Sequence, residues 1–174
     1  MLGLIAVVAM ASCSDNDNSW ETYYEWRQEN KTWFAEQENK LNADGSAYYE
    51  RVAGVWSPKE YVLVHWFNNR EETKGNLTPK LTSQVTTRYI GRMYNDVAFD
   101  SSYNNVDALS TFKVSGVIEG WQIALQNMHV GDSVELVIPY SLAYGSSSTG
   151  SIYPYSALRF NMSLVDIPNY ETRE

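Results

Sequence analysis

Val117-Ile118-Glu119-Gly120-Trp121 places two β-branched residues, a glycine and a tryptophan ahead of a helical pattern. Trp121, Leu125 and Met128 recur at the i, i+4, i+7 spacing of one helix face, so the pattern predicts a short helix whose apolar face begins at the indole. Gly120 allows close approach of the backbone at this point. A tryptophan in this position is either ordinary core or the floor of a pocket, and the surrounding chain has to distinguish the two.

The chain on both sides of this stretch predicts antiparallel strands. Residues 61–67 and 133–138 are rich in β-branched and aromatic side chains, and Pro139 ends the second of these segments. Leu158, Phe160, Met162 and Leu164 alternate with polar residues, which is typical of a strand with one buried face. Further strand character is found in residues 84–90 and 112–114, and a hairpin-like turn at 95–96 leads into 98–102. Several strands with one short helix indicate an α+β architecture.

The N-terminal part predicts helix. In residues 20–41 an apolar stripe runs along one side of a polar, glycine-free segment; its members are Tyr23, Trp26, Trp33, Phe34 and Leu41. Residues 47–52 are expected to form a second short helix, and 68–81 a polar loop. The aromatic stripe is expected to dock either on the following domain or on a second copy in a homodimer.

The first residues carry a targeting pattern. Residues 2–11 form an apolar run that is too short to span a bilayer, and it ends in Met10-Ala11-Ser12-Cys13. This ending resembles the lipobox of bacterial lipoproteins, although no Lys or Arg precedes the run. Because Cys13 is the only cysteine, it has no partner for an intramolecular disulfide. The resemblance implies that Cys13 is lipidated and anchors the protein to the outer membrane of the cell envelope; the alternative is a buried structural cysteine.

Composition excludes some classes of function. The formal net charge of -8 argues against a nucleic-acid partner, since nucleic acid requires a basic surface. His65 and His129 are the only histidines, and neither has a second His or Cys at ligand spacing. We therefore expect no metal and no cofactor. No plausible Ser-His-Asp set is present either.

Six short motifs occur in order in the second half of the chain. They are Tyr89-Ile90-Gly91, Phe99-Asp100-Ser101-Ser102, Val117 to Trp121, Val130-Gly131-Asp132, Ile138-Pro139 and Ala143-Tyr144-Gly145. Together they resemble an FKBP-type peptidyl-prolyl cis-trans isomerase over residues 84–167. The resemblance implies a curved antiparallel sheet wrapped around one short helix, with a pocket between them. The expected organisation is a signal peptide at 1–13, a tether and helical extension at 14–56 and an isomerase domain at 57–174.

The resemblance also implies a set of site residues. The implied catalytic residues are Tyr89, Phe99, Asp100 and Tyr144, and the implied substrate-binding residues are Val117, Ile118, Trp121, Ile152 and Phe160. Trp121 would form the floor, while the backbone N–H of Ile118 and the hydroxyl of Tyr144 would donate to ligand carbonyls. Val117 and Phe160 are alternatively plain core. Ser110 lies two residues before Phe112, at a position where the family often has a second aromatic residue, and this difference predicts a thinner pocket wall.

The implied function is isomerisation of X-Pro bonds in proline-containing segments of exported proteins. An apolar pocket of this kind needs no nucleophile, metal or proton relay, which agrees with the composition. The alternative is a non-catalytic FKBP-like chaperone or protein-binding module. A third hypothesis gives the main role to residues 20–56, as a dimerisation segment.

Overall fold

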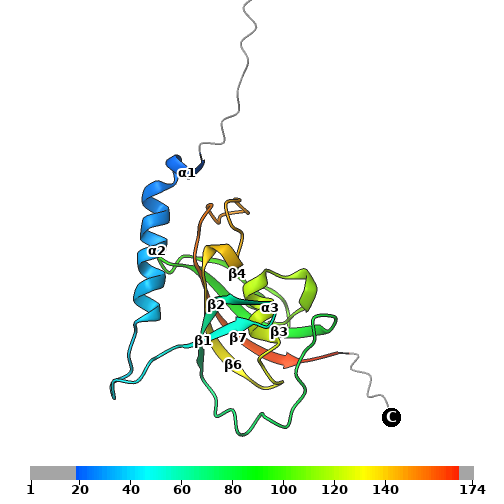
Figure 1. The fold of residues 1–174 in the computed structure, drawn as a ribbon. Helices are drawn as coiled ribbons and strands as arrows, with labels where there is room; N and C mark the ends of the chain where they lie inside the picture. Colours follow the sequence, from blue (N-terminus) through cyan, green and yellow to red (C-terminus); the bar gives the residue numbers. More distant parts are fainter. Residues whose placement is uncertain (1–18, 169–174) are drawn as a thin grey trace, which may run out of the picture.

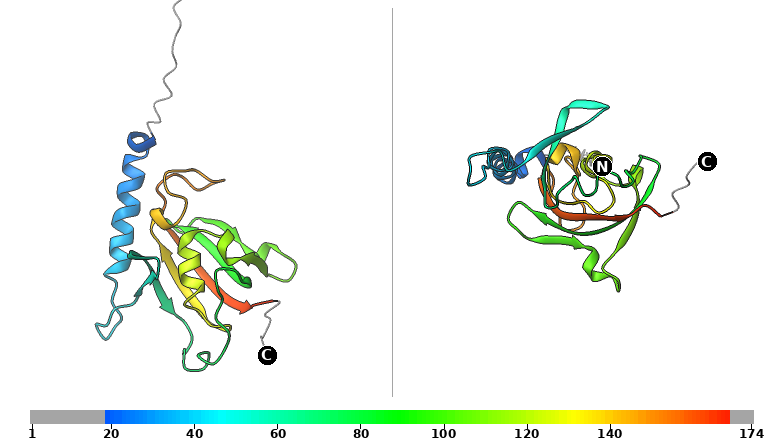
Figure 2. Two further views of the ribbon diagram at one scale, coloured as in Figure 1. Left: turned by 45° about the vertical axis from the view of Figure 1, so that its right-hand side comes forward. Right: turned by 90° about the horizontal axis from the view of Figure 1, so that it is seen from below.

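Seven strands form one antiparallel sheet in the computed structural model, which describes residues 19–168. The strand order is β1-β2-β6-β7-β3-β4, and β5 pairs with β3 beside this path. The sheet curves around the short helix α3, and the longer helix α2 stands on the other side (Figures 1 and 2). The predicted α+β fold, a curved sheet around one short helix with an N-terminal helical extension, is confirmed.

Most strands and both longer helical segments lie close to their predicted positions, with exceptions between residues 47 and 60. The strands are β1 (Glu50–Gly54), β2 (Ser57–Trp66), β3 (Gln84–Met93), β4 (Ala98–Ser101), β5 (Ser110–Lys113), β6 (Ser133–Ile138) and β7 (Leu158–Asp166). The helices are α1 (Ser19–Thr22), α2 (Tyr24–Glu38) and α3 (Glu119–Leu125). Three 3₁₀ turns complete the list: η1 (Ser102–Asn104), η2 (Val114–Gly116) and η3 (Tyr140–Leu142). No helix within residues 19–168 is both long and apolar enough to cross a membrane.

The prediction of a second helix at 47–52 is wrong, because this segment leads into β1. Val52 pairs with Val62 of β2, and β2 itself begins at Ser57, earlier than expected. A strand in this place is stabilised by its neighbour across the hairpin, and that pairing is not visible in a local pattern. The helix predicted over residues 20–41 is divided into α1 and α2, and α2 ends at Glu38, so Leu41 lies beyond it and is exposed.

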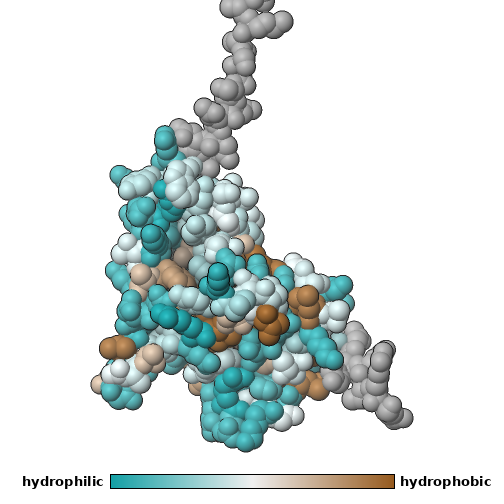
Figure 3. Space-filling model, in the orientation of Figure 1, coloured by the Kyte–Doolittle hydropathy of each residue, from teal (hydrophilic) through white to brown (hydrophobic). Residues whose placement is uncertain are grey.

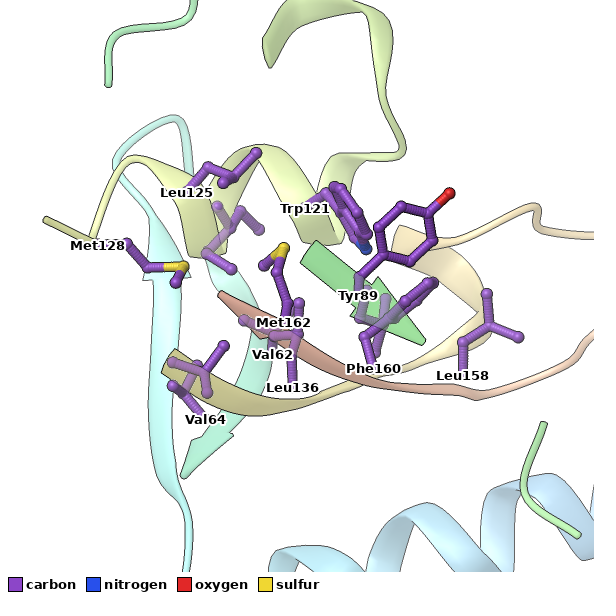
Figure 4. Packing of buried hydrophobic residues seen from close by; sticks show 14 of the residues in the cluster. Val62, Val64, Tyr89, Trp121, Leu125, Met128, Leu136, Leu158, Phe160 and Met162 are labelled. Atoms are coloured by element: carbon purple, nitrogen blue, oxygen red, sulfur yellow. The ribbon is translucent and has the colours of Figure 1, made fainter. Parts of the chain in front are cut away.

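The main core lies between α3 and the concave face of the sheet (Figure 4). Leu158, Phe160, Met162 and Leu164 of β7 are all buried, as their alternation predicted. Helix α3 approaches β6 so closely that a Cβ atom on Gly120 would lie 2.8 Å from Cδ1 of Ile138. Only glycine at this position allows the helix to pack on the strand without displacing it. Met128 lies beyond the end of α3 but is fully buried with Leu125.

Helix α2 covers the opposite face of the sheet. Trp33 and Phe34 pack against Tyr49, Leu63 and Val137, which alternate with the residues that face α3. The outward side of α2 is mainly polar and is lined by Gln28, Lys31, Thr32, Ala35, Glu36 and Asn39. The aromatic stripe thus packs on the domain of its own chain, while the homodimer stays a prediction. On the face shown in Figure 3 the surface is mainly hydrophilic, with hydrophobic side chains in small groups.

A buried carboxylate joins the polar loop after β2 to the turn before β6. Asp132 accepts hydrogen bonds from Nδ2 of Asn68 (3.0 Å), from the hydroxyl of Thr73 (2.5 Å) and from the backbone N–H of His129 (2.8 Å). The guanidinium of Arg70 lies 3.6 Å away. Burial by itself raises the pKa of Asp132, but these donors and the Arg70 charge outweigh it and hold the pKa below its usual value.

We predict that Asp132→Asn lowers the free energy of unfolding at pH 7 by about 2–4 kcal/mol, since an amide cannot accept all three bonds and leaves Arg70 without its counter-charge. Because the pKa of Asp132 is lower in the folded chain than in the unfolded one, its contribution is complete above about pH 4 and is lost as the pH falls through the folded value. Urea unfolding measured across acid pH should therefore show a flatter acid limb for the variant. The exposed Asp166→Asn is the control and should change stability by under about 0.5 kcal/mol; equal effects of both changes would contradict the prediction.

Candidate functional site

A cavity of about 250 Å³ opens between α3 and the concave face of the sheet. Its lining residues are Tyr89, Phe99, Asp100, Phe112, Gly116, Val117, Ile118, Trp121, Tyr144 and Phe160. Strands β3, β4, β5 and β7 supply aromatic rings, and the segment before α3 supplies the aliphatic side. The structure therefore brings together eight of the nine residues that the sequence singled out for the pocket.

Trp121 lies at the base of this cavity and is 4% exposed. The rings of Tyr89, Phe160 and Phe112 meet the indole nearly at right angles, with centroids 5.0, 5.2 and 5.7 Å away. Figure 4 shows Tyr89 and Phe160 beside the indole. Edge-to-face pairs of this kind each contribute about 0.5–1.5 kcal/mol beyond burial of area, so the indole is held in one orientation. Its Nε1 is buried and has no hydrogen-bond partner within residues 19–168.

The third residue of the Tyr89-Ile90-Gly91 motif is a glycine because two aromatic rings pack directly on it. A Cβ atom at this position would lie 2.7 Å from both Phe99 and Phe160. These two rings pack edge to face with centroids 5.6 Å apart, directly over the glycine. Since strand residues two apart share one face, Tyr89 and Gly91 both turn toward the cavity. The absence of a side chain at Gly91 therefore allows Phe99 and Phe160 to pack beside Tyr89 in the cavity wall.

Tyr89 and Asp100 form a hydrogen bond across the β3–β4 pair. The hydroxyl of Tyr89 donates to Oδ2 of Asp100 at 2.6 Å, and Oδ1 of the same carboxylate accepts from the backbone N–H of Ser101 at 2.8 Å. Burial, followed by the bond to Asp100, raises the pKa of Tyr89 far above the usual value for tyrosine. The buried hydroxyl of Ser102 accepts from the backbone N–H of Tyr89 at 2.9 Å. The Phe99-Asp100-Ser101-Ser102 motif thus fixes β4 against β3 and orients the phenol of Tyr89.

Two hydrogen-bond donors in the cavity wall have no partner within residues 19–168. One is the backbone N–H of Ile118, which immediately precedes α3. The other is the hydroxyl of Tyr144, whose pKa is raised by burial and by the negative charge of Asp100. The phenol therefore stays protonated at neutral pH and keeps a proton to donate. An apolar floor with two unused donors in its wall suits a ligand with an apolar ring and carbonyl oxygens beside it.

Ile152 is the one predicted site residue that the structure does not place in the cavity wall. It belongs to the loop that follows Tyr144, its side chain is buried in the main core, and its backbone N–H donates to the carbonyl of Thr149. Phe112 and Gly116 line the cavity but were not among the predicted site residues. Strand alternation could have indicated Phe112, because it lies opposite the buried Val85 in the β3–β5 pair and so belongs to the same inward face.

The part of the chain that the structure describes holds no group of three His, Cys, Asp or Glu side chains suited to a metal ion. The cavity is lined by aromatic rings, aliphatic side chains, hydrogen-bond donors and the carboxylate of Asp100. The chemistry that such a site supplies is burial, orientation and hydrogen bonding.

The curved sheet around one short helix, with an aromatic cavity between them, defines a domain of the FKBP type. A family model described as FKBP-type peptidyl-prolyl cis-trans isomerase matches residues 75–165, which is more than half of the chain. The chain belongs to this family.

Relatives with known names support the same assignment. The chain is 35% identical to the isomerase FkpA of Escherichia coli K12 over 125 residues, which cover 72% of this chain and 46% of FkpA. It is 41% identical to the isomerase Mip of Coxiella burnetii over 91 residues, covering 52% of this chain and 39% of Mip. The chain therefore spans less than half the length of these two relatives.

Solved structures share the fold. An isomerase from Pseudomonas syringae pv. tomato superposes with a TM-score of 0.65 at 26% identity, covering 83% of this chain and 95% of that one. FkpA of Escherichia coli superposes with a TM-score of 0.67 at 24% identity, covering 84% of this chain and 63% of that one. At 24% identity, the similarity to the FkpA structure is evidence for the fold alone.

Proposed function

We propose that this chain is a peptidyl-prolyl cis-trans isomerase that accelerates rotation about X-Pro bonds in exported proteins. In this proposal the proline ring enters the cavity and rests on Trp121. The observation that carries the proposal is the apolar floor at Trp121 together with the two unpartnered donors of Ile118 and Tyr144 in the wall. A cavity of about 250 Å³ is slightly below the usual size of drug-sized ligand pockets, about 300–1,000 Å³, and suits a single small ring.

The chemistry follows from the amide bond. Rotation is slow because partial double-bond character sets a barrier of about 18–20 kcal/mol. In the transition state the amide is twisted and less dipolar than in the planar ground state. An apolar cavity that excludes water stabilises the twisted form relative to the planar one, and only such differential stabilisation raises the rate.

The polar groups of the site have separate roles in this mechanism. The N–H of Ile118 and the hydroxyl of Tyr144 donate to carbonyl oxygens beside the proline and hold the substrate backbone on each side of the rotating bond. Asp100 already accepts a hydrogen bond from the Tyr89 hydroxyl, so it orients that ring and is not needed as a base. No covalent intermediate is required.

A protease-coupled assay with a proline peptide tests the proposal. The purified chain should isomerise the peptide above the uncatalysed rate. Phe99→Ala should lower kcat/KM by about tenfold or more, because it opens the aromatic wall, and Trp121→Leu should lower it further. Tyr144→Phe should lower it by about fivefold, the value of one hydrogen bond of about 1 kcal/mol.

The control for this assay is Phe67→Ala, since Phe67 is exposed and does not line the cavity. Its kcat/KM should equal that of the unmodified chain. A rate that never exceeds background would contradict the proposal. If the chain then still bound proline peptides, the non-catalytic chaperone or binding module would replace it.

We further propose that the protein is anchored to the cell envelope through a lipid on Cys13. Cys13 lies outside the residues that the structure describes, so the proposal is supported by the lipobox-like sequence alone. Mass spectrometry of the mature N-terminus should find Cys13 as the first residue with attached acyl chains, and Cys13→Ala should abolish both processing and membrane fractionation. An unmodified Cys13 thiol in the mature protein would contradict the anchor.

A further inference from the structure

Helix α2 contacts both segments of chain that frame the cavity. The indole Nε1 of Trp26 donates to the hydroxyl of Ser156 at 3.1 Å. The same indole meets the ring of Tyr153 at 5.1 Å and that of Tyr94 at 5.0 Å, in both cases nearly edge to face. Tyr153 and Ser156 belong to the loop that follows Tyr144, while Tyr94 belongs to the turn that leads from β3 to Phe99. Trp26 of α2 thus contacts both the loop that follows Tyr144 and the turn between β3 and β4.

Asn30, one helical turn further along α2, makes a second contact with the same loop. Its side chain is 1% exposed, and Oδ1 accepts a hydrogen bond from the backbone N–H of Ala157 at 2.8 Å. Its Nδ2 donates to the carbonyl of Trp26 at 2.7 Å. Both ends of a buried amide are therefore paired, and loss of the side chain would leave the N–H of Ala157 buried without an acceptor. Ala157 directly precedes β7, which carries Phe160 into the cavity.

The loop held by these contacts contains a residue in an unfavourable backbone conformation. Tyr155 has a φ of +61°, in the left-handed region that bulky side chains rarely adopt. Its backbone N–H donates to the carbonyl of Gly145 at 2.8 Å, and its ring meets those of Trp20 and Tyr140 edge to face. Such a conformation persists only where the surroundings enforce it. Gly145 is the neighbour of Tyr144, so the contacts that hold Tyr155 also fix the base of the Tyr144 side chain.

We propose that α2 is a positioning element for the cavity: Trp26 and Asn30 hold the 145–157 loop so that Tyr144 presents its hydroxyl to the ligand. Trp26 and Asn30 are positioning residues, because neither lines the cavity. Helix α2 is then more than an extension between tether and domain. Its effect on catalysis rests on the proposed isomerase function, whereas its hold on the loop does not.

The first test measures the loop directly. In the full chain, Asn30→Ala should speed hydrogen exchange of the Tyr155 backbone N–H by about tenfold or more, while amides of the β6–β7 pair keep their rates. Thr32→Ala, on the outward side of the same helix, is the matched control and should leave both unchanged. Trp26→Phe keeps a ring in place but removes the donor to Ser156, and it serves as the milder variant if Asn30→Ala does not fold. Unchanged exchange at Tyr155 in the variants that fold would overturn the proposal.

The second test is a double-mutant cycle in the isomerase assay. Asn30→Ala should lower kcat/KM by about fivefold in the otherwise unmodified chain but by less than about twofold in a Tyr144→Phe background, because the hydroxyl it positions is then absent. Two reductions that simply multiply would overturn the link to Tyr144, since a purely structural role of Asn30 lowers activity equally in both backgrounds. An unmodified chain without isomerase activity would contradict the proposed function, and the exchange experiment would still decide whether α2 holds the loop.

Discussion

The contact of Trp121 with the rings of Tyr89, Phe112 and Phe160 is the interaction on which the rest of the structure depends. It requires α3 to lie close against the sheet, which Gly120 permits by packing directly on Ile138. The sheet in turn has to curve so that β3, β5 and β7 all reach the same indole. Trp121 is therefore both the floor of the cavity and a member of the main core. Because the core is closely packed, it holds the floor of the cavity in place.

The polar groups around this floor fall into two sets. The hydroxyl of Tyr89 and the carboxylate of Asp100 are bonded to each other and orient the wall. The N–H of Ile118 and the hydroxyl of Tyr144 have no partner in the described part of the chain, and both residues line the cavity. Unused donors in a largely apolar site are where a ligand gains orientation, because they form their bonds only when the ligand is present. This division gives the site its proposed ability to hold the proline ring and the neighbouring carbonyl groups while the X-Pro bond rotates.

Much of the fold followed from local patterns, while the rest depended on distant contacts. The alternation of β7 marked that strand because it buries one regular set of side chains, and the apolar run of β6 marked the other because its last three residues are buried on both faces of the sheet. The segment at 47–52 was misassigned as helix, since β1 is stabilised by β2 and not by its own sequence. Ile152 was expected to line the cavity but packs in the main core, and the hydrogen bond from the backbone N–H of Ala157 to Asn30 joins residues 127 positions apart. A local sequence pattern cannot predict a hydrogen bond between residues so far apart in the chain.

In the proposed function, proline binds over Trp121. Titration of the ¹⁵N-labelled chain with a short Leu-Pro peptide, followed by NMR, tests this binding mode at the residues concerned. We expect saturable chemical-shift changes of the Ile118 backbone amide and of the Trp121 indole N–H, and their loss in Phe99→Ala. Saturable shifts confined to residues outside the cavity, or no shifts at millimolar peptide, would contradict it.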